Sequence, residues 1–219
     1  MNIHAFSFCG ETLHALGSGA LFWPREALLV VSDLHLGKSE RIARKGGPTL
    51  PPYETQDTLQ RLADALDTTK ATTVICLGDS FDDDAAGQAL SDTARATLSR
   101  LKAGRRWTWI TGNHDPGPLD LGGEHLSEVT LGPLTFRHIA EPEAQAEVSG
   151  HYHPKARLRT RAGTVSRPCF LYDETRLILP AFGTYTGGLW SSDPALAFMG
   201  PKALAILTGA QPLAIPMPR

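Results

Sequence analysis

The chain has 219 residues, of which 42% are hydrophobic and 20% are charged. This length and balance predict one globular domain covering residues 1–219. The formal net charge of −2 excludes binding of nucleic acid through overall basicity, so an anionic substrate needs metal ions or a local cationic patch. No membrane span or signal peptide is visible and the three cysteines are far apart, which predicts a reduced, cytoplasmic protein without a membrane partner.

The first half of the chain alternates short apolar runs with helical patterns. The runs at residues 28–32, 73–77 and 107–111 end at Gly or polar residues, as buried strands do. Between them, apolar residues recur at helical spacing over residues 59–66 and 90–101. Strand–helix–strand alternation predicts an α/β arrangement with parallel strands.

After Asp115 the chain is punctuated by Pro and Gly, and the apolar runs become shorter. We expect an antiparallel second half, with a hairpin turn at residues 173–175. Because the polar motifs are shared between the two halves, the site is expected where the halves meet. The expected strands lie at residues 134–138, 147–149, 155–161, 169–172, 177–179 and 203–207.

Four short polar peptides each follow a strand-like run, and loops at such strand ends commonly bind ligands. Their carboxylate, amide and imidazole groups suit Mn, Fe or Zn, and the lack of thiolates argues against a structural zinc site. Two cations roughly 3.5–4 Å apart can hold both oxygens of a phosphate ester, so the set predicts a two-metal phosphoesterase. Asp79 is the candidate bridging carboxylate. The peptides are Asp33-Leu34-His35, Gly78-Asp79, Gly112-Asn113-His114-Asp115 and Gly150-His151-Tyr152-His153.

These peptides, together with His138 after a predicted strand, resemble the motifs of the calcineurin-like metallophosphoesterase superfamily. The resemblance implies a four-layer α/β/β/α sandwich, of class α/β (α+β), with a dinuclear metal site at the strand ends. His138 is preferred over His125, because His125 lies in a Gly-rich stretch. By resemblance, one metal is held by Asp33, His35, Asp79 and His153, and the other by Asp79, Asn113, His138 and His151.

The same resemblance gives His114 a catalytic role rather than a ligand role. It implies that His114 faces the phosphate and either stabilises the transition state or protonates the leaving oxygen. In many relatives an acid three residues past the bridging Asp orients this His, and here that acid is Asp82. Asp83 and Asp84 follow directly, so the choice among the three carboxylates stays open.

Further stretches resemble the bacterial DNA ligase-associated metallophosphoesterases, from about Leu21 to Leu207. They are Phe22-Trp23-Pro24, the basic residues after His35, Arg167-Pro168-Cys169-Phe170 and residues 179–188. This resemblance implies a Mn-dependent endonuclease on single-stranded nucleic acid, encoded beside an ATP-dependent DNA ligase and a DEXH-type helicase in a DNA repair group. Fe, Zn or Mg are the other candidate metals. The chain departs from the family pattern near the end of the second motif, where many members are expected to have a His and this chain has Asp82-Asp83. This departure bears on which residue of that motif partners His114.

Basic residues flank two of the metal motifs and are the candidate substrate contacts. Lys155, Arg157, Arg159 and Arg161 alternate, so a strand would place all four on one face, where they could hold phosphates. Lys38, Arg41 and Arg44 could form the other wall of such a track. A solvated strand face explains the alternation equally well. Trp190, Tyr185 and Phe182 could stack bases or serve the core.

Two other functions compete with the nuclease. A phosphohydrolase of a small nucleotide or a lipid-linked pyrophosphate would use the same metals. A non-catalytic scaffold subunit is disfavoured, because every ligand position and His114 are present.

Overall fold

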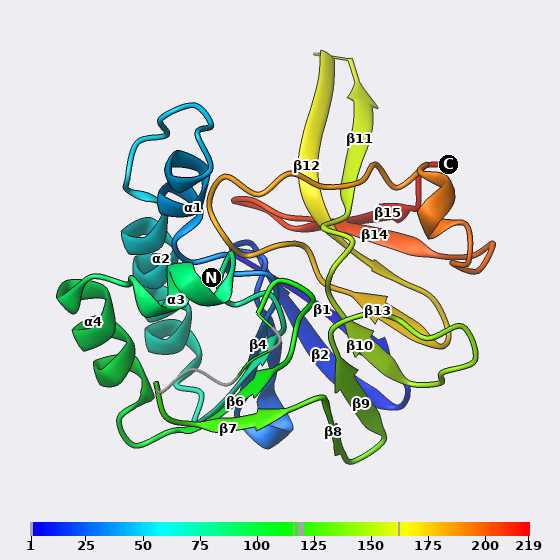
Figure 1. Cartoon of the computed structure of the whole chain (residues 1–219). Helices are drawn as coiled ribbons and strands as arrows, with labels where there is room; N and C mark the ends of the chain where they lie inside the picture. Colours follow the sequence, from blue (N-terminus) through cyan, green and yellow to red (C-terminus); the bar gives the residue numbers. More distant parts are fainter. Residues whose placement is uncertain (1, 116, 118–120, 162) are drawn as a thin grey trace.

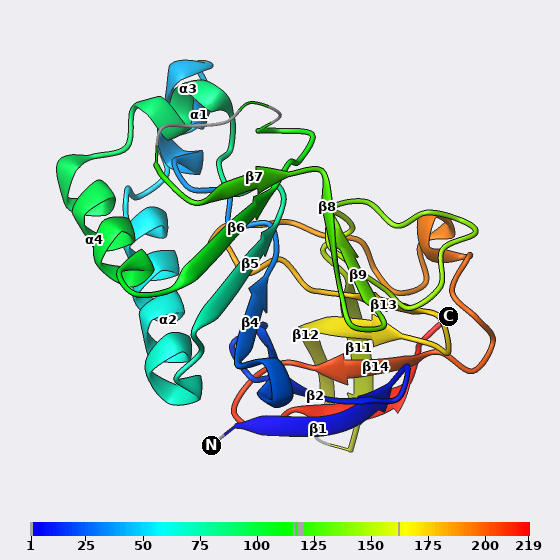
Figure 2. The same cartoon turned by 90° about the horizontal axis from the view of Figure 1, so that it is seen from below.

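The computed structural model describes residues 2–115, 117, 121–161 and 163–219. Two β-sheets lie face to face, and the α-helices of the described residues cover the outer face of the first sheet (Figures 1 and 2). The expected sandwich of sheets and helices is therefore confirmed. None of the described helices is long and apolar enough to cross a membrane.

The first sheet has seven strands in sequence order, β1 to β7. Strands β4 to β7 are parallel, as predicted, and β1 to β3 extend the sheet with antiparallel pairs. The predicted strands at 28–32, 73–77 and 107–111 correspond to β4, β5 and β6. The strands are β1 (Ile3–Phe8), β2 (Glu11–Leu16), β3 (Leu21–Trp23), β4 (Leu28–Val31), β5 (Thr73–Leu77), β6 (Arg106–Ile110) and β7 (Glu124–Leu126).

The helices connect the parallel strands of this sheet. The two predicted amphipathic patterns form α2 and α4, which bury their leucines against the sheet. Ser91 begins α4 by accepting a hydrogen bond from the Ala94 amide. The helices are α1 (Lys38–Arg44), α2 (Glu54–Thr69), α3 (Asp84–Gln88) and α4 (Asp92–Lys102), with short 3₁₀ turns η1 (Pro24–Glu26) and η2 (Pro194–Leu196).

The second sheet is mixed, which corrects the expectation of an antiparallel second half. Strand β10 runs parallel to both of its neighbours, β9 and β13, because the chain crosses over before it returns to β13. The remaining pairs are antiparallel, and the predicted turn at residues 173–175 joins β12 to β13. The strands are β8 (Glu128–Leu131), β9 (Leu134–Arg137), β10 (Glu147–Ser149), β11 (Lys155–Thr160), β12 (Gly163–Tyr172), β13 (Arg176–Ile178), β14 (Leu204–Leu207) and β15 (Leu213–Pro216).

Alternating side chains of the central strands pack into two different apolar clusters. In β4, Leu28 and Val30 face the second sheet, whereas Leu29 and Val31 face the helices. A third cluster covers the outer face of the second sheet, where the 3₁₀ turn η2 stands in place of an α-helical layer. Because both faces of β4 are buried, its carboxyl end and the loop after it are fixed in position.

Strands β11 and β12 form a long two-stranded ribbon that projects from the second sheet (Figure 1). Ala156 and Leu158 point toward the third apolar cluster. Lys155, Arg157 and Arg159 therefore occupy the opposite face of β11, as the alternation predicted, whereas the fourth residue of the pattern, Arg161, lies one residue past the end of the strand.

Candidate metal centre

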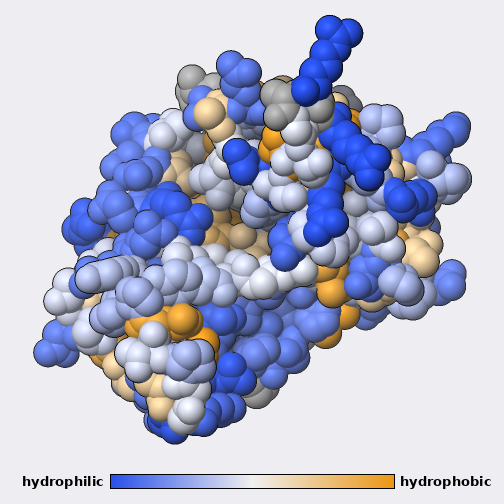
Figure 3. Space-filling model, turned by 90° about the horizontal axis from the view of Figure 1, so that it is seen from above, coloured by the Kyte–Doolittle hydropathy of each residue, from blue (hydrophilic) through white to orange (hydrophobic). Residues whose placement is uncertain are grey.

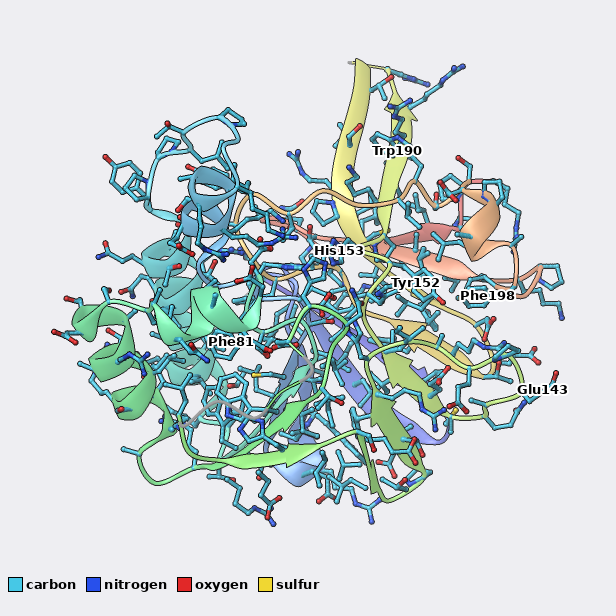
Figure 4. The ribbon with its side chains drawn as sticks, viewed as in Figure 1. Phe81, Glu143, Tyr152, His153, Trp190 and Phe198 are labelled. Carbon is cyan, nitrogen blue, oxygen red and sulfur yellow. The ribbon has the colours of Figure 1, made fainter. Side chains whose placement is uncertain are left out.

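All of the predicted metal-ligand loops meet where the ends of the two sheets face each other. Hydrogen bonds join the loops directly: the Asp33 amide donates to Gly78 O at 3.2 Å, and the Gly150 amide donates to His138 O at 2.9 Å. The His151 amide donates to Asp33 Oδ2 at 3.0 Å, which links the two sheets through a candidate ligand. The side chains around His153 converge between the sheets in Figure 4.

The first cluster consists of Asp33, His35 and His153. One ligand atom from each lies within 4.8 Å of the others, and His153 Nε2 is 3.1 Å from Asp33 Oδ1. Apart from this close contact, these two atoms and His35 Nε2 have no hydrogen-bond partner among the described residues, and all three atoms are buried. Lone-pair atoms that converge in this way suit a divalent cation, so the residues fit the first metal of a dinuclear site.

The second cluster consists of Asp79, His138, His151 and Asn113. His138 Nε2 lies 3.0 Å from Asn113 Oδ1, 3.3 Å from His151 Nδ1 and 3.4 Å from Asp79 Oδ2. His138 Nδ1 is 2.8 Å from the carbonyl oxygen of Leu77, which only accepts, so Nδ1 carries the hydrogen and Nε2 offers its lone pair. These residues fit a second cation. The rival His125 lies on β7, against Trp109 and outside both clusters.

Five candidate ligands adopt left-handed backbone conformations, which non-glycine residues seldom do. Their φ angles are 53° for Asp33, 45° for His35, 46° for Asp79, 70° for His151 and 46° for His153. Such strain costs on the order of 1–3 kcal/mol per residue and persists where the surroundings enforce it. The fold thus holds these side chains in a fixed arrangement for a ligand.

The site carboxylates are ionised in this environment. Burial opposes ionisation of Asp79, yet the contact with His138, the charges of the histidines and the His114 amide lower its pKa to about 2. Asp33 is fully buried, and its contacts with His153 and Ser32 still lower its pKa. Ionised carboxylates are the form that binds cations.

The carboxylate of Asp82 does not pair with His114, which corrects that expectation. It lies 2.9 Å from His35 Nδ1 and 2.9 Å from Arg41 Nη1, with Lys38 Nζ at 3.5 Å. The cations of α1 draw the carboxylate toward His35, and together these contacts outweigh burial and lower the pKa of Asp82. Asp82 thereby fixes the His35 ring with Nε2 facing the first cluster.

His114 is oriented by backbone groups instead. Its Nδ1 lies 2.9 Å from the carbonyl oxygen of Asp82, and its amide donates to Asp79 Oδ1 at 2.8 Å. Its ring stands edge-on to His35, with centroids 5.1 Å apart. Because a carbonyl oxygen only accepts, Nδ1 carries a hydrogen, and Nε2 is left to act beside the metal clusters. The Asp83 carboxylate caps α3 at Ala86.

The predicted substrate contacts fall into two groups. On α1, Lys38 and Arg41 contact Asp82, and Arg44 Nη2 lies 2.8 Å from both oxygens of Asp83. On β11, Lys155 and Arg157 instead lie over the ring of Trp190. The expected α1 wall is therefore largely neutralised, whereas the cations of the β11 wall form no ion pair with a carboxylate in the described part of the chain. Phe182 is fully buried and belongs to the core, so it cannot stack a base.

Two supporting features of the site were missed at the sequence level. The buried Asp115 carboxylate accepts hydrogen bonds from the Ser80, Phe81 and Gly112 amides, tying two motif loops together. Burial, with the nearby charge of Asp79, raises the pKa of Asp115 to about 7 despite these bonds. In the sequence, the position of Asp115 at the end of the Gly112–Asp115 peptide was the signal that could have indicated this supporting role.

The second feature is a strap formed by residues 179–190. The Phe182 amide donates to Ser32 O at 2.8 Å, and the Leu189 amide donates to Tyr152 O at 3.2 Å. The strap thus fastens the ligand loop of the first sheet to that of the second. Its visible signals in the sequence were the glycines at residues 183, 187 and 188 and the resemblance of residues 179–188 to the family.

Replacing Gly188 by Ala is expected to reduce Mn-activated hydrolysis about 10- to 100-fold, the usual effect of losing support for a metal ligand. Gly188 has a φ of +155°, and a Cβ there would lie 2.9 Å from the Cβ of His153 and overlap its carbonyl oxygen. Gly187 is the matched control, because a Cβ there meets nothing within 4 Å. Mn titrations of both variants with bis-p-nitrophenyl phosphate test this; equal Mn requirements would contradict it.

The model of the calcineurin-like phosphoesterase family matches residues 27–175. The chain belongs to this family, and it is a metal-dependent hydrolase of phosphate esters. Among solved structures, the crystal structure of Pseudomonas putida nuclease MPE is similar, with a TM-score of 0.73 and 29% sequence identity. The match covers 97% of this chain and 100% of that one. A search of curated proteins found no match.

Proposed function

We propose that the protein is a two-metal phosphodiesterase that acts as a Mn-dependent endonuclease on single-stranded DNA or RNA. The observation that carries this proposal is the cationic face of β11, which forms no ion pair with a carboxylate of the described residues and starts two residues after the candidate ligand His153. Figure 3 looks down on the side from which the ribbon projects, and that side is largely hydrophilic. The similarity to a protein named as a nuclease supports a nucleic acid substrate.

Each candidate residue has a proposed role in binding the cations, in positioning a ligand or in catalysis. Asp33, His35 and His153 would hold the first cation, and Asp79, Asn113, His138 and His151 would hold the second. By the resemblance of the sequence to the family, Asp79 would also serve the first cation. When bound, the two cations supply Lewis-acid polarisation of the phosphate and activation of water. Asp82 keeps His35 in position, and His114 acts on the phosphate or on the leaving oxygen.

Manganese is the proposed metal because the resemblance of the sequence to the family implies it, and the oxygen and imidazole ligands of the two clusters are compatible with it. Iron, zinc and magnesium accept parts of the same set, so restoring metal-free protein with each metal in turn tests the choice. From the resemblance of the sequence, we place this activity in cytoplasmic DNA repair, beside an ATP-dependent DNA ligase and a DEXH-type helicase. The chain would act as one metallophosphoesterase domain, since ligands come from both sheets.

Replacing Arg157 by Gln is expected to weaken binding of single-stranded DNA and to lower the slope of log affinity against log salt by about 0.7 for one lost phosphate contact. Within the described residues, no ion pair joins Lys155 or Arg157 to a carboxylate. The matched change Arg44→Gln removes a guanidinium already held by Asp83, so its effect should be smaller. Binding curves at several salt concentrations compare the two, and a larger effect of Arg44→Gln would reverse the assignment of the track.

Cleavage of circular single-stranded DNA tests the function itself. Metal-stripped protein with Mn added back should linearise the circle, which has no ends for an exonuclease. Failure to cut, with bis-p-nitrophenyl phosphate still hydrolysed, would keep the metal centre and move the substrate to a small nucleotide or lipid-linked pyrophosphate. Inactivity on both substrates, with Mn bound, would point to a scaffold subunit.

A further inference from the structure

Trp190 lies on the cationic face of β11 rather than in the core. The Arg157 guanidinium carbon is 3.8 Å from the centroid of its ring, and Lys155 Nζ is 5.0 Å away. Trp190 belongs to none of the three apolar clusters formed by the described residues. Core packing therefore does not explain a large aromatic residue at this position.

The backbone fixes Trp190 relative to the metal centre. The Lys155 amide donates to Leu189 O at 2.8 Å, and the Ser191 amide donates to Lys155 O at 2.8 Å, so Trp190 bridges to the root of β11. The strap that contains Trp190 also contains Gly188, whose backbone packs closely against His153. Figure 4 shows Trp190 at the base of the ribbon, on the same side of the molecule as His153. A ligand held here would lie next to the first metal cluster.

The Arg157 side chain combines charge with a flat surface. A guanidinium that stacks on an indole stays planar and oriented, and it can also stack against a base or bind a phosphate. Arg157 is exposed, and in the described part of the chain Lys155, Arg157 and Arg159 form no ion pair with a carboxylate. The chemistry offered is thus cationic and aromatic at once, as in grooves that bind single strands.

We propose that Trp190 and Arg157 form a stacking platform for one unpaired nucleotide that flanks the scissile phosphate. Base faces are hidden by stacking in a duplex and available in a single strand, so the platform selects unpaired substrates. This proposal rests on the proposed nuclease function and adds to it the group that recognises the strand. Phosphates would be held by Lys155 and Arg159 on the same face.

The test measures binding by fluorescence anisotropy, with metal chelated so that no cleavage occurs. One probe is a single-stranded DNA oligonucleotide, and the other has the same backbone with abasic nucleotides. Trp190→Ala should weaken binding of the normal strand about 5- to 100-fold, which is the range for one lost base–aromatic stack. The same variant should weaken binding of the abasic strand far less. Trp190→Phe, which keeps a ring, should retain most of the affinity. Tyr53→Ala is the control, since Tyr53 is an aromatic side chain that is 66% exposed at the start of α2.

Two outcomes overturn the platform. Equal losses on both probes would mean that Trp190 only braces Arg157 for phosphate binding, and wild-type affinity in Trp190→Ala would mean that the ring is not used. Trp190→Leu replaces the Ala variant if that variant does not fold, as judged by its Mn-dependent rise in melting temperature. Cleavage of circular DNA by the wild type separates this result from the proposed function: a wild type that cuts, with an unaffected Trp190 variant, refutes the platform alone.

Discussion

Replacing Asp79 by Asn is expected to lower Mn-dependent hydrolysis by more than about 100-fold, beyond the effect of removing an outer-shell partner. Asn preserves the volume but removes the negative charge that holds two cations against their repulsion. Asp79 Oδ1 accepts a hydrogen bond from the His114 amide, and Oδ2 lies 3.4 Å from His138 Nε2, so the side chain links His114 to the rest of the second cluster. Rates on bis-p-nitrophenyl phosphate, together with Mn binding by calorimetry, measure the effect.

Asp92→Asn is the matched control for this variant, because Asp92 is exposed in the first turn of α4. It should bind Mn and hydrolyse the diester as the wild type does. Should Asp79→Asn retain both the Mn stoichiometry and the rate, the assignment of Asp79 as the shared ligand is wrong. If the Asp79→Asn variant binds one Mn ion where the wild type binds two, this result supports Asp79 as the shared ligand.

Replacing His114 by Ala is expected to slow DNA cleavage about 100- to 10,000-fold, the range for loss of a general acid or base. The ring is held by the carbonyl oxygen of Asp82 and lies beside His35, but it is not needed to complete either ligand cluster. The variant should therefore bind Mn normally. Single-turnover cleavage rates and Mn titrations of the same preparation separate chemistry from metal binding.

The choice of substrate shows what His114 does. The p-nitrophenolate group leaves readily without a proton, whereas the sugar oxygen of DNA does not. If His114 protonates the leaving oxygen, His114→Ala should slow DNA cleavage much more than diester hydrolysis. Equal losses on the two substrates indicate stabilisation of charge on the phosphate, and normal rates on both would remove His114 from the mechanism.

The sequence predicted the position of a candidate ligand well where that residue follows a buried strand. Asp33 and Asp79 each lie two residues past the ends of β4 and β5, whose apolar runs are short and unambiguous, so the position of each carboxylate follows from the strand end. The antiparallel strands β1 and β2 were missed because their half-buried pattern mixes polar and apolar residues, and β3 was missed because it has only three residues. The two parallel pairs of β10 depend on a crossover that no local pattern encodes.

Side-chain partners were harder to predict than positions. The family resemblance paired Asp82 with His114, but in the structure the carboxylate lies against His35 and the cations of α1. Phe182 and Trp190 looked equivalent as aromatic residues in one strap, yet Phe182 is buried under Arg61 and Trp190 lies against Arg157. Such choices depend on packing between distant segments, which the order of residues does not reveal.

The hydrogen bond from the His151 amide to Asp33 joins residues 118 positions apart. During synthesis, the chain leaves the ribosome from its amino end, so Asp33 and His35 emerge long before the histidines at 151 and 153. The nascent chain therefore lacks the candidate ligands His151 and His153 until the second sheet has been synthesised. A chain truncated before residue 151 is expected to expose Asp33 and His35 without the histidines that complete the two clusters.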